Sequence, residues 1–146
     1  MTGLARVSMI AFAAMVAGIL GLFYARALFH QTPFAMVPQM AAAALMVWAR
    51  FTFGKRSFHA AASPTSGGIV RTGPYRFIRH PIYTAGILFV VPAAILSGTL
   101  AAYAFASLVI AGAVVRMLCE EAMLVRQYPE YADYMRTTSR SIPGIF

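Results

Sequence analysis

The feature that most constrains this chain is its three long runs without a charged residue. Residues 7–25 and 27–49 hold 19 and 23 uncharged, mostly apolar residues, and residues 82–115 hold 34. A transmembrane helix needs about 20 such residues, so each of the first two runs can form one span and the third can form two. We therefore predict an all-α integral membrane protein with about four transmembrane helices.

The composition excludes a soluble or a disordered protein. Hydrophobic residues make up 60% of the 146 residues and charged residues 11%, whereas soluble domains carry about 25% charged residues. A small soluble domain cannot bury that much apolar surface, and a disordered chain is poor in apolar residues. The net charge of +8 would suit nucleic-acid binding, but the basic residues stand at the ends of apolar runs, where they mark topology. We expect membrane lipids, and no nucleic acid, as partners.

A turn divides the longest apolar run. The turn residues Ser97 and Gly98 predict helices near residues 82–96 and 99–116, joined as a tight hairpin. The chain after this hairpin predicts one or two amphipathic helices at the membrane interface. The first apolar run exceeds the roughly 7–15 residues of a signal peptide, so we expect it to remain as a span. We interpret residues 1–146 as a single membrane-embedded domain.

The basic residues predict the orientation of the chain. With both termini inside, eleven of the twelve basic residues fall on the cytoplasmic side and only Arg26 falls outside. The positive-inside rule favours this arrangement. We therefore predict a multi-pass protein whose termini and active site face the cytoplasm.

Arg79, His80 and Pro81 form the first candidate site. Because proline suits the first helical position, we expect His80 at the N-cap of the third span. Free backbone N–H groups and the positive end of the helix dipole lie there, with Arg76 and Arg79 beside them, which suits a carboxylate or phosphate. In the structural alternative, the arginines reach lipid phosphates and His80 only caps the helix.

Glu120 and Glu121 form the second candidate site. They are two of the four acidic residues, and they stand near the predicted C-terminal end of a helix, where the dipole disfavours negative charge. Arg116 lies four residues before Glu120 and can pair with it. Glu121 cannot share that face, because neighbours on a helix point about 100° apart. It is therefore either solvated or functional, and ionisable groups at membrane depth are candidates for function.

Tyr128, Tyr131 and Tyr134 recur every third residue after the last span. An aromatic belt at the membrane interface explains this spacing. The alternative is that the rings line a cavity for a cationic or heteroaromatic ligand.

The sequence predicts no metal site and no disulfide. Its three histidines, His30, His59 and His80, stand far apart in the chain, and no zinc or nucleotide-binding motif is present. The lone Cys119 excludes an internal disulfide.

Several motifs, taken together, resemble one family. They are G-P-Y-R-F-I-R-H-P-I-Y at residues 73–83, E-E-x-x-L at 120–124, Y-P-E-Y-A-D-Y at 128–134 and R-S-I-P at 140–143. This combination resembles the isoprenylcysteine carboxyl methyltransferase family, in the same superfamily as the membrane phospholipid N-methyltransferases. The resemblance covers about residues 65–146, and the first two spans match only in hydropathy.

The resemblance implies a small helical enzyme that uses S-adenosylmethionine and releases S-adenosylhomocysteine. By position, it implies cofactor contacts for Tyr75, Arg79, His80, Tyr83, Gly86, Glu120 and Glu121. It also implies catalytic roles for Glu121, Arg126 and Arg140, with the two arginines beside the acceptor. The family usually has glycine two residues after the motif tyrosine, where this chain has Ala85, and Gly86 follows.

The chemistry of these residues fits that cofactor. The arginine-rich helix start suits the carboxylate of S-adenosylmethionine, and the glutamate pair suits its ammonium group or ribose hydroxyls. Arginine beside the acceptor favours an anion, such as the carboxylate of an isoprenylcysteine or of another membrane lipid. Two alternatives stay open: a sterol-reductase-like membrane enzyme and a non-catalytic lipid-binding scaffold.

Overall fold

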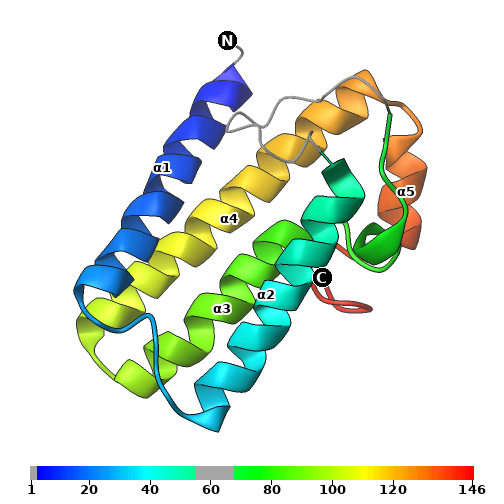
Figure 1. The fold of residues 1–146 in the computed structure, drawn as a ribbon. Helices are drawn as coiled ribbons and strands as arrows, with labels where there is room; N and C mark the ends of the chain where they lie inside the picture. Colours follow the sequence, from blue (N-terminus) through cyan, green and yellow to red (C-terminus); the bar gives the residue numbers. More distant parts are fainter. Residues whose placement is uncertain (1–2, 55–67) are drawn as a thin grey trace.

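The computed structural model describes residues 3–54 and 68–146 of the chain. These two stretches form five α-helices and one short 3-10 helix, and one isolated β-bridge is their only β pairing (Figure 1). The elements are α1 (Gly3–Tyr24), α2 (Pro33–Phe53), η2 (Gly73–Arg76), α3 (Pro81–Ser97), α4 (Leu100–Gln127) and α5 (Tyr131–Thr137). The predicted all-α class is confirmed.

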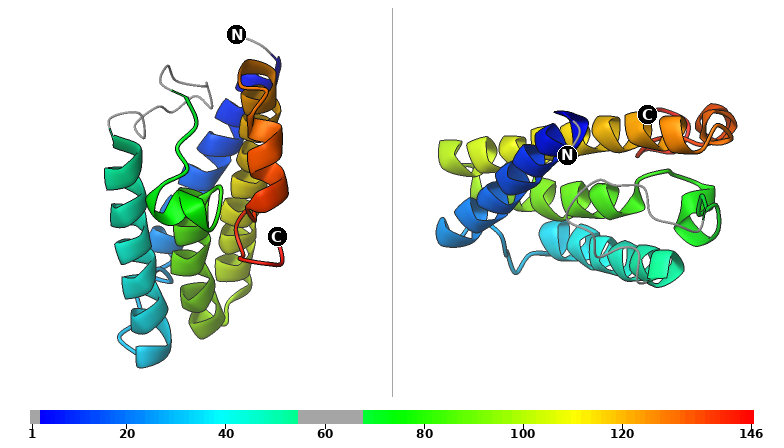
Figure 2. Two further views of the ribbon diagram at one scale, coloured as in Figure 1. Left: turned by 90° about the vertical axis from the view of Figure 1, so that its right-hand side faces the viewer. Right: turned by 90° about the horizontal axis from the view of Figure 1, so that it is seen from above.

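The four long helices pack in the spatial order α1, α4, α3, α2 (Figures 1 and 2). The start of α1, the end of α2, the start of α3 and the end of α4 all lie toward one end of the bundle (Figure 1). This end carries the motif residues, so the candidate site lies where the charged segments meet. Three residues used in the predictions lie outside the described residues: Lys55 and Arg56, counted among the cytoplasmic basic residues, and His59, one of the three histidines.

Glycines allow α1 and α4 to approach closely. A Cβ atom at Gly18 would lie 2.8 Å from the carbonyl oxygen of Phe105, and one at Gly112 would lie 2.7 Å from that of Ala11. Both distances are too short for a real side chain, so glycine sets the separation between the helices, as is common in membrane proteins. This packing fixes the register of α1 against α4.

Three of the described helices, α1, α2 and α4, are long and apolar enough to cross a membrane. α3 is apolar as well, but its 17 residues fall short of the usual span of about 20. The structure thus provides three candidate spans, and a membrane crossing by α3 stays a prediction.

α3 and α4 form the predicted hairpin. Gly98 ends α3 in the left-handed conformation, with a φ of 63°, which glycine adopts without strain. Thr99 then caps α4, because its hydroxyl oxygen accepts a hydrogen bond from the Ala102 N–H at 3.2 Å.

α4 is longer than the sequence predicts. We expected it to end near residue 116, but it continues to Gln127. Glu120 and Glu121 therefore lie about two turns before the helix end. The expected unfavourable contact with the C-terminal dipole is wrong, because that effect is confined to the last turn.

The chain after α4 forms only one short helix, α5, followed by a non-helical C-terminal segment, residues 138–146. Tyr131 and Tyr134 of α5 are 3% and 4% exposed, so their interpretation as an interfacial belt is wrong. They face the protein because α5 packs beside η2, where the Tyr134 hydroxyl donates to the backbone carbonyl of Tyr75.

The variant Gly112→Ala tests the packing of α1 on α4. The added methyl group meets the Ala11 carbonyl, so α1 must move, and overpacking of this kind costs about 1–3 kcal/mol. We expect a lower melting temperature for the purified protein in detergent. Gly86→Ala is the matched control, because a Cβ at this helical glycine meets no atom within 4 Å, and it should melt at or slightly above the parent temperature. Equal melting of Gly112→Ala and the parent would contradict the close packing.

Candidate functional site

Backbone pairing between two distant segments builds the site. The Arg79 N–H donates to the Ser139 carbonyl at 2.8 Å, and the His80 N–H donates to the Arg140 carbonyl at 3.0 Å. The C-terminal segment therefore lies alongside the residues that lead into α3. This pairing brings Arg140 to the start of α3, although 60 positions separate it from His80 in the sequence.

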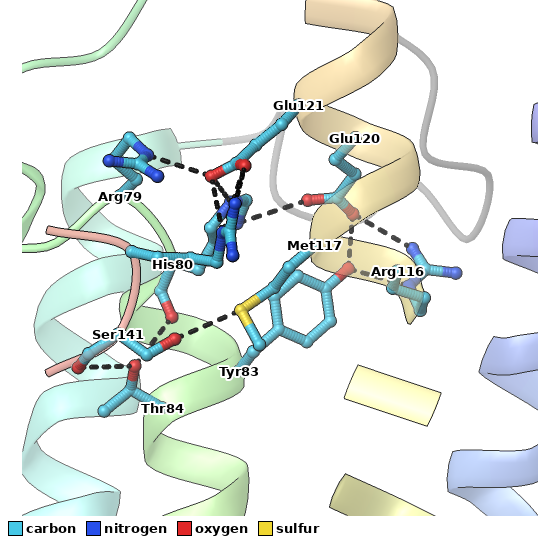
Figure 3. A network of polar contacts seen from close by, with 10 residues as sticks. Arg79, His80, Tyr83, Thr84, Arg116, Met117, Glu120, Glu121 and Ser141 are labelled. Carbon is cyan, nitrogen blue, oxygen red and sulfur yellow. Dashed lines mark hydrogen bonds and ion pairs between the residues drawn. The ribbon is translucent and has the colours of Figure 1, made fainter. Parts of the chain in front are cut away.

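Ser141 continues this attachment on both sides. The Thr84 hydroxyl of α3 donates to the Ser141 carbonyl at 3.2 Å, and the Ser141 hydroxyl donates to the sulfur of Met117 in α4 at 3.1 Å (Figure 3). The C-terminal segment is thus fastened to both helices of the hairpin.

His80 occupies the N-cap of α3, as predicted, and Pro81 is the first helical residue. The His80 side chain makes no capping hydrogen bond and faces α4 instead. There, Nε2 lies 3.1 Å from Glu121 Oε1 and Nδ1 lies 3.6 Å from Glu120 Oε2. The ring therefore links the two carboxylates.

Glu121 holds the largest number of basic partners. Besides His80, its carboxylate contacts Arg79 Nε at 2.9 Å (Figure 3). It also contacts Arg140 Nη2 at 2.8 Å. The side chain is 4% exposed, so the alternative that Glu121 is merely solvated is wrong. A buried carboxylate is stable only when it is paired and hydrogen-bonded, and these partners meet that need.

Arg79 is held from both sides. Its Nε donates to Glu121, while its Nη1 donates to the backbone carbonyls of Met135 at 3.1 Å and of Thr138. The planar guanidinium, with its fixed fork of donors, can serve the carboxylate and both carbonyls at once. Arg79 thereby joins α4 to the end of α5.

Glu120 faces a different set of partners. The Tyr83 hydroxyl donates to its Oε1, and Arg116 Nη2 lies 3.4 Å from the same oxygen, which confirms the predicted pairing of Arg116 with Glu120. The Glu120 side chain is 23% exposed. Of the two glutamates, Glu120 is therefore the one whose carboxylate can still accept a ligand group.

The charges of this polar cluster do not cancel. The cluster comprises Arg79, His80, Tyr83, Arg116, Glu120, Glu121 and Arg140. Three arginines against two glutamates leave one positive charge when the histidine is neutral. A site with one surplus guanidinium charge attracts an anionic group such as a carboxylate.

An open cavity of about 380 Å³ lies beside the cluster. It is lined by Arg79, by the end of α5 with Arg136, and by the C-terminal segment with Arg140. The Arg140 guanidinium also lies 4.7 Å from the centre of the Phe146 ring. The arginines on the cavity wall are the groups that would receive an anion there.

Three residues with expected cofactor or acceptor roles make none of the side-chain contacts that define the polar cluster. Tyr75 packs its ring 5.4 Å from that of Phe53, and Gly86 borders open space. Arg126 is exposed in the last turn of α4. Their proposed roles stay predictions.

Burial keeps the tyrosines of this region protonated. It raises the pKa of Tyr75 above its usual value and raises the pKa of Tyr134 to about 12. The Tyr134 hydroxyl therefore remains a hydrogen-bond donor to the Tyr75 carbonyl even near pH 10, where an exposed tyrosine with a pKa of about 10 would be half ionised. This contact attaches α5 to η2.

Two parts of the site are not expected from the sequence. Arg116 is predicted only as a partner for Glu120, but this arginine also donates to the Tyr83 hydroxyl at 2.7 Å. The backbone pairing of residues 79–80 with residues 139–140 is not predicted either, because the sequence carries no β-strand pattern there. The R-S-I-P motif was the one signal at that position.

A sequence model of the phospholipid methyltransferase family matches residues 49–131. The chain belongs to this family. The match spans more than half of the chain and includes α3, α4 and every residue of the polar cluster except Arg140. The family lies in one superfamily with the isoprenylcysteine carboxyl methyltransferases, so the resemblance seen in the sequence is confirmed. Members of this family are described as phospholipid methyltransferases, and enzymes of the family in general use S-adenosylmethionine.

Two curated proteins are similar to part of the chain. The nickel-cobalt-cadmium resistance protein NccN of Alcaligenes xylosoxydans xylosoxydans is 33% identical over 80 residues, which are 53% of this chain and 37% of that protein. The cobalt-zinc-cadmium resistance protein CzcN of Cupriavidus metallidurans is also 33% identical over 80 residues, 53% of this chain and 36% of that protein. The match thus covers little more than a third of either relative. No solved structure matches significantly.

The variant Glu121→Gln tests whether the carboxylate holds the C-terminal segment. Removing the charge of a buried ion pair leaves its partners uncompensated and typically costs about 3–5 kcal/mol. We expect a lower melting temperature and faster trypsin cleavage after Arg140. Asp133→Asn is the matched control, since its ion pair with Arg136 is exposed and 3.9 Å long and should contribute little. Parent-like cleavage of Glu121→Gln would show that the ion pairs do not retain the segment.

Proposed function

We propose that this protein is an S-adenosylmethionine-dependent methyltransferase that modifies a lipophilic acceptor at the membrane, with the polar cluster as its cofactor site. The observation that carries the proposal is the convergence of Arg79, His80, Glu121 and Arg140 from three separate segments. Such a costly group of charges at the end of a membrane bundle is a candidate for function. Family membership gives the class of reaction.

The chemistry of the cluster fits the cofactor. The surplus positive charge beside the arginine-lined cavity suits its carboxylate, and the partly exposed Glu120 suits its ammonium group or ribose hydroxyls. The open space beside Gly86, one turn after Tyr83, leaves room on that face of α3. When bound, S-adenosylmethionine supplies an electrophilic methyl group on its sulfonium.

The two glutamates would act differently in this proposal. Glu120 contacts the cofactor, with Tyr83 and His80 beside it. Glu121, saturated by Arg79, His80 and Arg140, orients these basic groups toward the ligand. Fixed donors of this kind need no reorganisation when a ligand binds, which favours catalysis by alignment.

The acceptor that these residues favour is an anion, such as the carboxylate of an isoprenylcysteine or of another membrane lipid. Arg140, which contacts Glu121, and the exposed Arg126 in the last turn of α4 are the basic groups that would attract it. A carboxylate is already nucleophilic and needs no general base. A labelled-methyl assay with prenylcysteine analogues and fractionated membrane lipids would identify the acceptor.

Calorimetry in detergent tests the cofactor site. The parent protein should bind S-adenosylhomocysteine, and Glu120→Gln should weaken that binding about tenfold or more because it removes a charged hydrogen bond worth about 1.5–3 kcal/mol. Glu130→Gln, the same change at an exposed residue, is the control and should bind as the parent does.

Two results would overturn this assignment. A parent protein that binds a nicotinamide cofactor, and not S-adenosylhomocysteine, would favour a sterol-reductase-like enzyme. Binding of neither ligand would favour a non-catalytic lipid-binding scaffold. A folded Glu120→Gln variant within about twofold of the parent affinity, a gap of only about 0.4 kcal/mol, would remove Glu120 from the cofactor site.

We also propose that both termini and the cluster face the cytoplasm, because this orientation puts eleven of the twelve basic residues inside. A reporter fused after Phe146 should then be active on the cytoplasmic side. Activity confined to the outer side would reverse the topology.

A further inference from the structure

Arg116 contacts three helices from a buried position. Its side chain is 4% exposed and lies in α4. Its Nη1 donates to the Ser8 carbonyl of α1 at 3.2 Å. Its Nε donates to the Tyr83 hydroxyl of α3 at 2.7 Å, and its Nη2 lies 3.4 Å from Glu120 Oε1 (Figure 3). The guanidinium therefore has a defined partner in each direction of its plane.

Two aromatic rings hold the same guanidinium. Its central carbon lies 5.0 Å from the centre of the Phe12 ring of α1 and 5.8 Å from that of Tyr83. Both distances fall within the range of cation–π attraction. The stacking limits rotation of the guanidinium plane, so the direction of its hydrogen bonds is fixed as well.

The contacts of Arg116, Tyr83 and Glu120 close a triangle. Tyr83 has one hydroxyl proton, which it donates to Glu120, and its oxygen accepts from Arg116. Arg116 reaches Glu120 directly too. The arginine thus determines where the Tyr83 oxygen and the Glu120 carboxylate lie.

Helix α1, which contacts Arg116 through Ser8 and Phe12, lies outside the region that the family match covers, residues 49–131. It reaches Arg116 because the close approach at Gly112, one turn earlier in α4, sets the register of α1. Interhelical attachment alone would not require a buried charge, since apolar residues of similar volume serve that purpose at least as well. The charge points instead to the two polar groups that it orients.

We propose that Arg116 is a positioning residue of the methyltransferase site: it holds Tyr83 and Glu120 in place for the cofactor, and Phe12 of α1 supports it. This inference rests on the proposed function. It assigns α1 a part in the site in addition to anchoring the chain in the membrane.

A double-mutant cycle tests the action through Tyr83. In the parent background, we expect Arg116→Gln to weaken S-adenosylhomocysteine binding about tenfold. In a Tyr83→Phe background, the same change should have an effect at least threefold smaller, because the hydroxyl that Arg116 positions is already absent. A merely structural role would lower the melting temperature while leaving the two effects on binding independent. Coupling below threefold would therefore overturn the proposal.

Arg116→Lys covers the case in which Arg116→Gln does not fold. Lysine keeps the positive charge but lacks the planar fork, so a folded Arg116→Lys variant should still lose at least about threefold in affinity. An affinity equal to that of the parent would overturn the positioning role. Arg6→Gln, a change at an exposed arginine of α1, is the control and should leave the affinity unchanged.

Phe12→Leu tests the part of α1. We expect it to weaken binding about threefold by loosening the stacked guanidinium, whereas Phe23→Leu, at an exposed position near the far end of α1, should bind within about twofold of the parent. Equal affinities of the two variants would remove α1 from the site. Failure of the parent itself to bind S-adenosylhomocysteine would instead overturn the proposed function, and this inference with it.

Discussion

The carboxylate of Glu121 is buried inside the protein against Arg79, His80 and Arg140, which come from two other segments of the chain. The arrangement of the bundle end that carries the motif residues depends on these ion pairs. They allow α4 to continue past its charged residues, because each charge finds a partner within the protein instead of ending the helix. They also hold the C-terminal segment beside the start of α3, where its backbone pairs with residues 79 and 80.

The polar cluster has two halves with different surroundings. Glu121 is saturated and buried, and it joins α4 to the C-terminal segment. Glu120 is partly exposed and is oriented by Tyr83 and Arg116, whose support reaches α1. The ring of His80 lies between the carboxylates and links the halves. One half therefore provides a rigid frame, and the other presents a carboxylate that a ligand can reach.

Local sequence rules predicted the parts of the site that depend on neighbouring residues. Pro81 placed His80 at the N-cap, and the four-residue spacing predicted the contact of Arg116 with Glu120. The partners of Glu121 could not be found in this way, since Arg79 stands 42 positions away and Arg140 stands 19. Helical spacing carries no information about pairs at such distances. Local chemistry singled out Arg79, His80 and Glu121 separately, and only the motif resemblance connected them with Arg140.

The sequence by itself determined the membrane class, the all-helical fold, the α3–α4 hairpin and the segments that carry the motifs, because these follow from charge-free runs and local turn chemistry. The tertiary structure alone decided the length of α4, the burial of Tyr131 and Tyr134, and the different surroundings of the two glutamates. The physical reason is that a charge or a polar ring is stable in the interior only if a partner meets it there. In this protein those partners come from segments far apart in the chain.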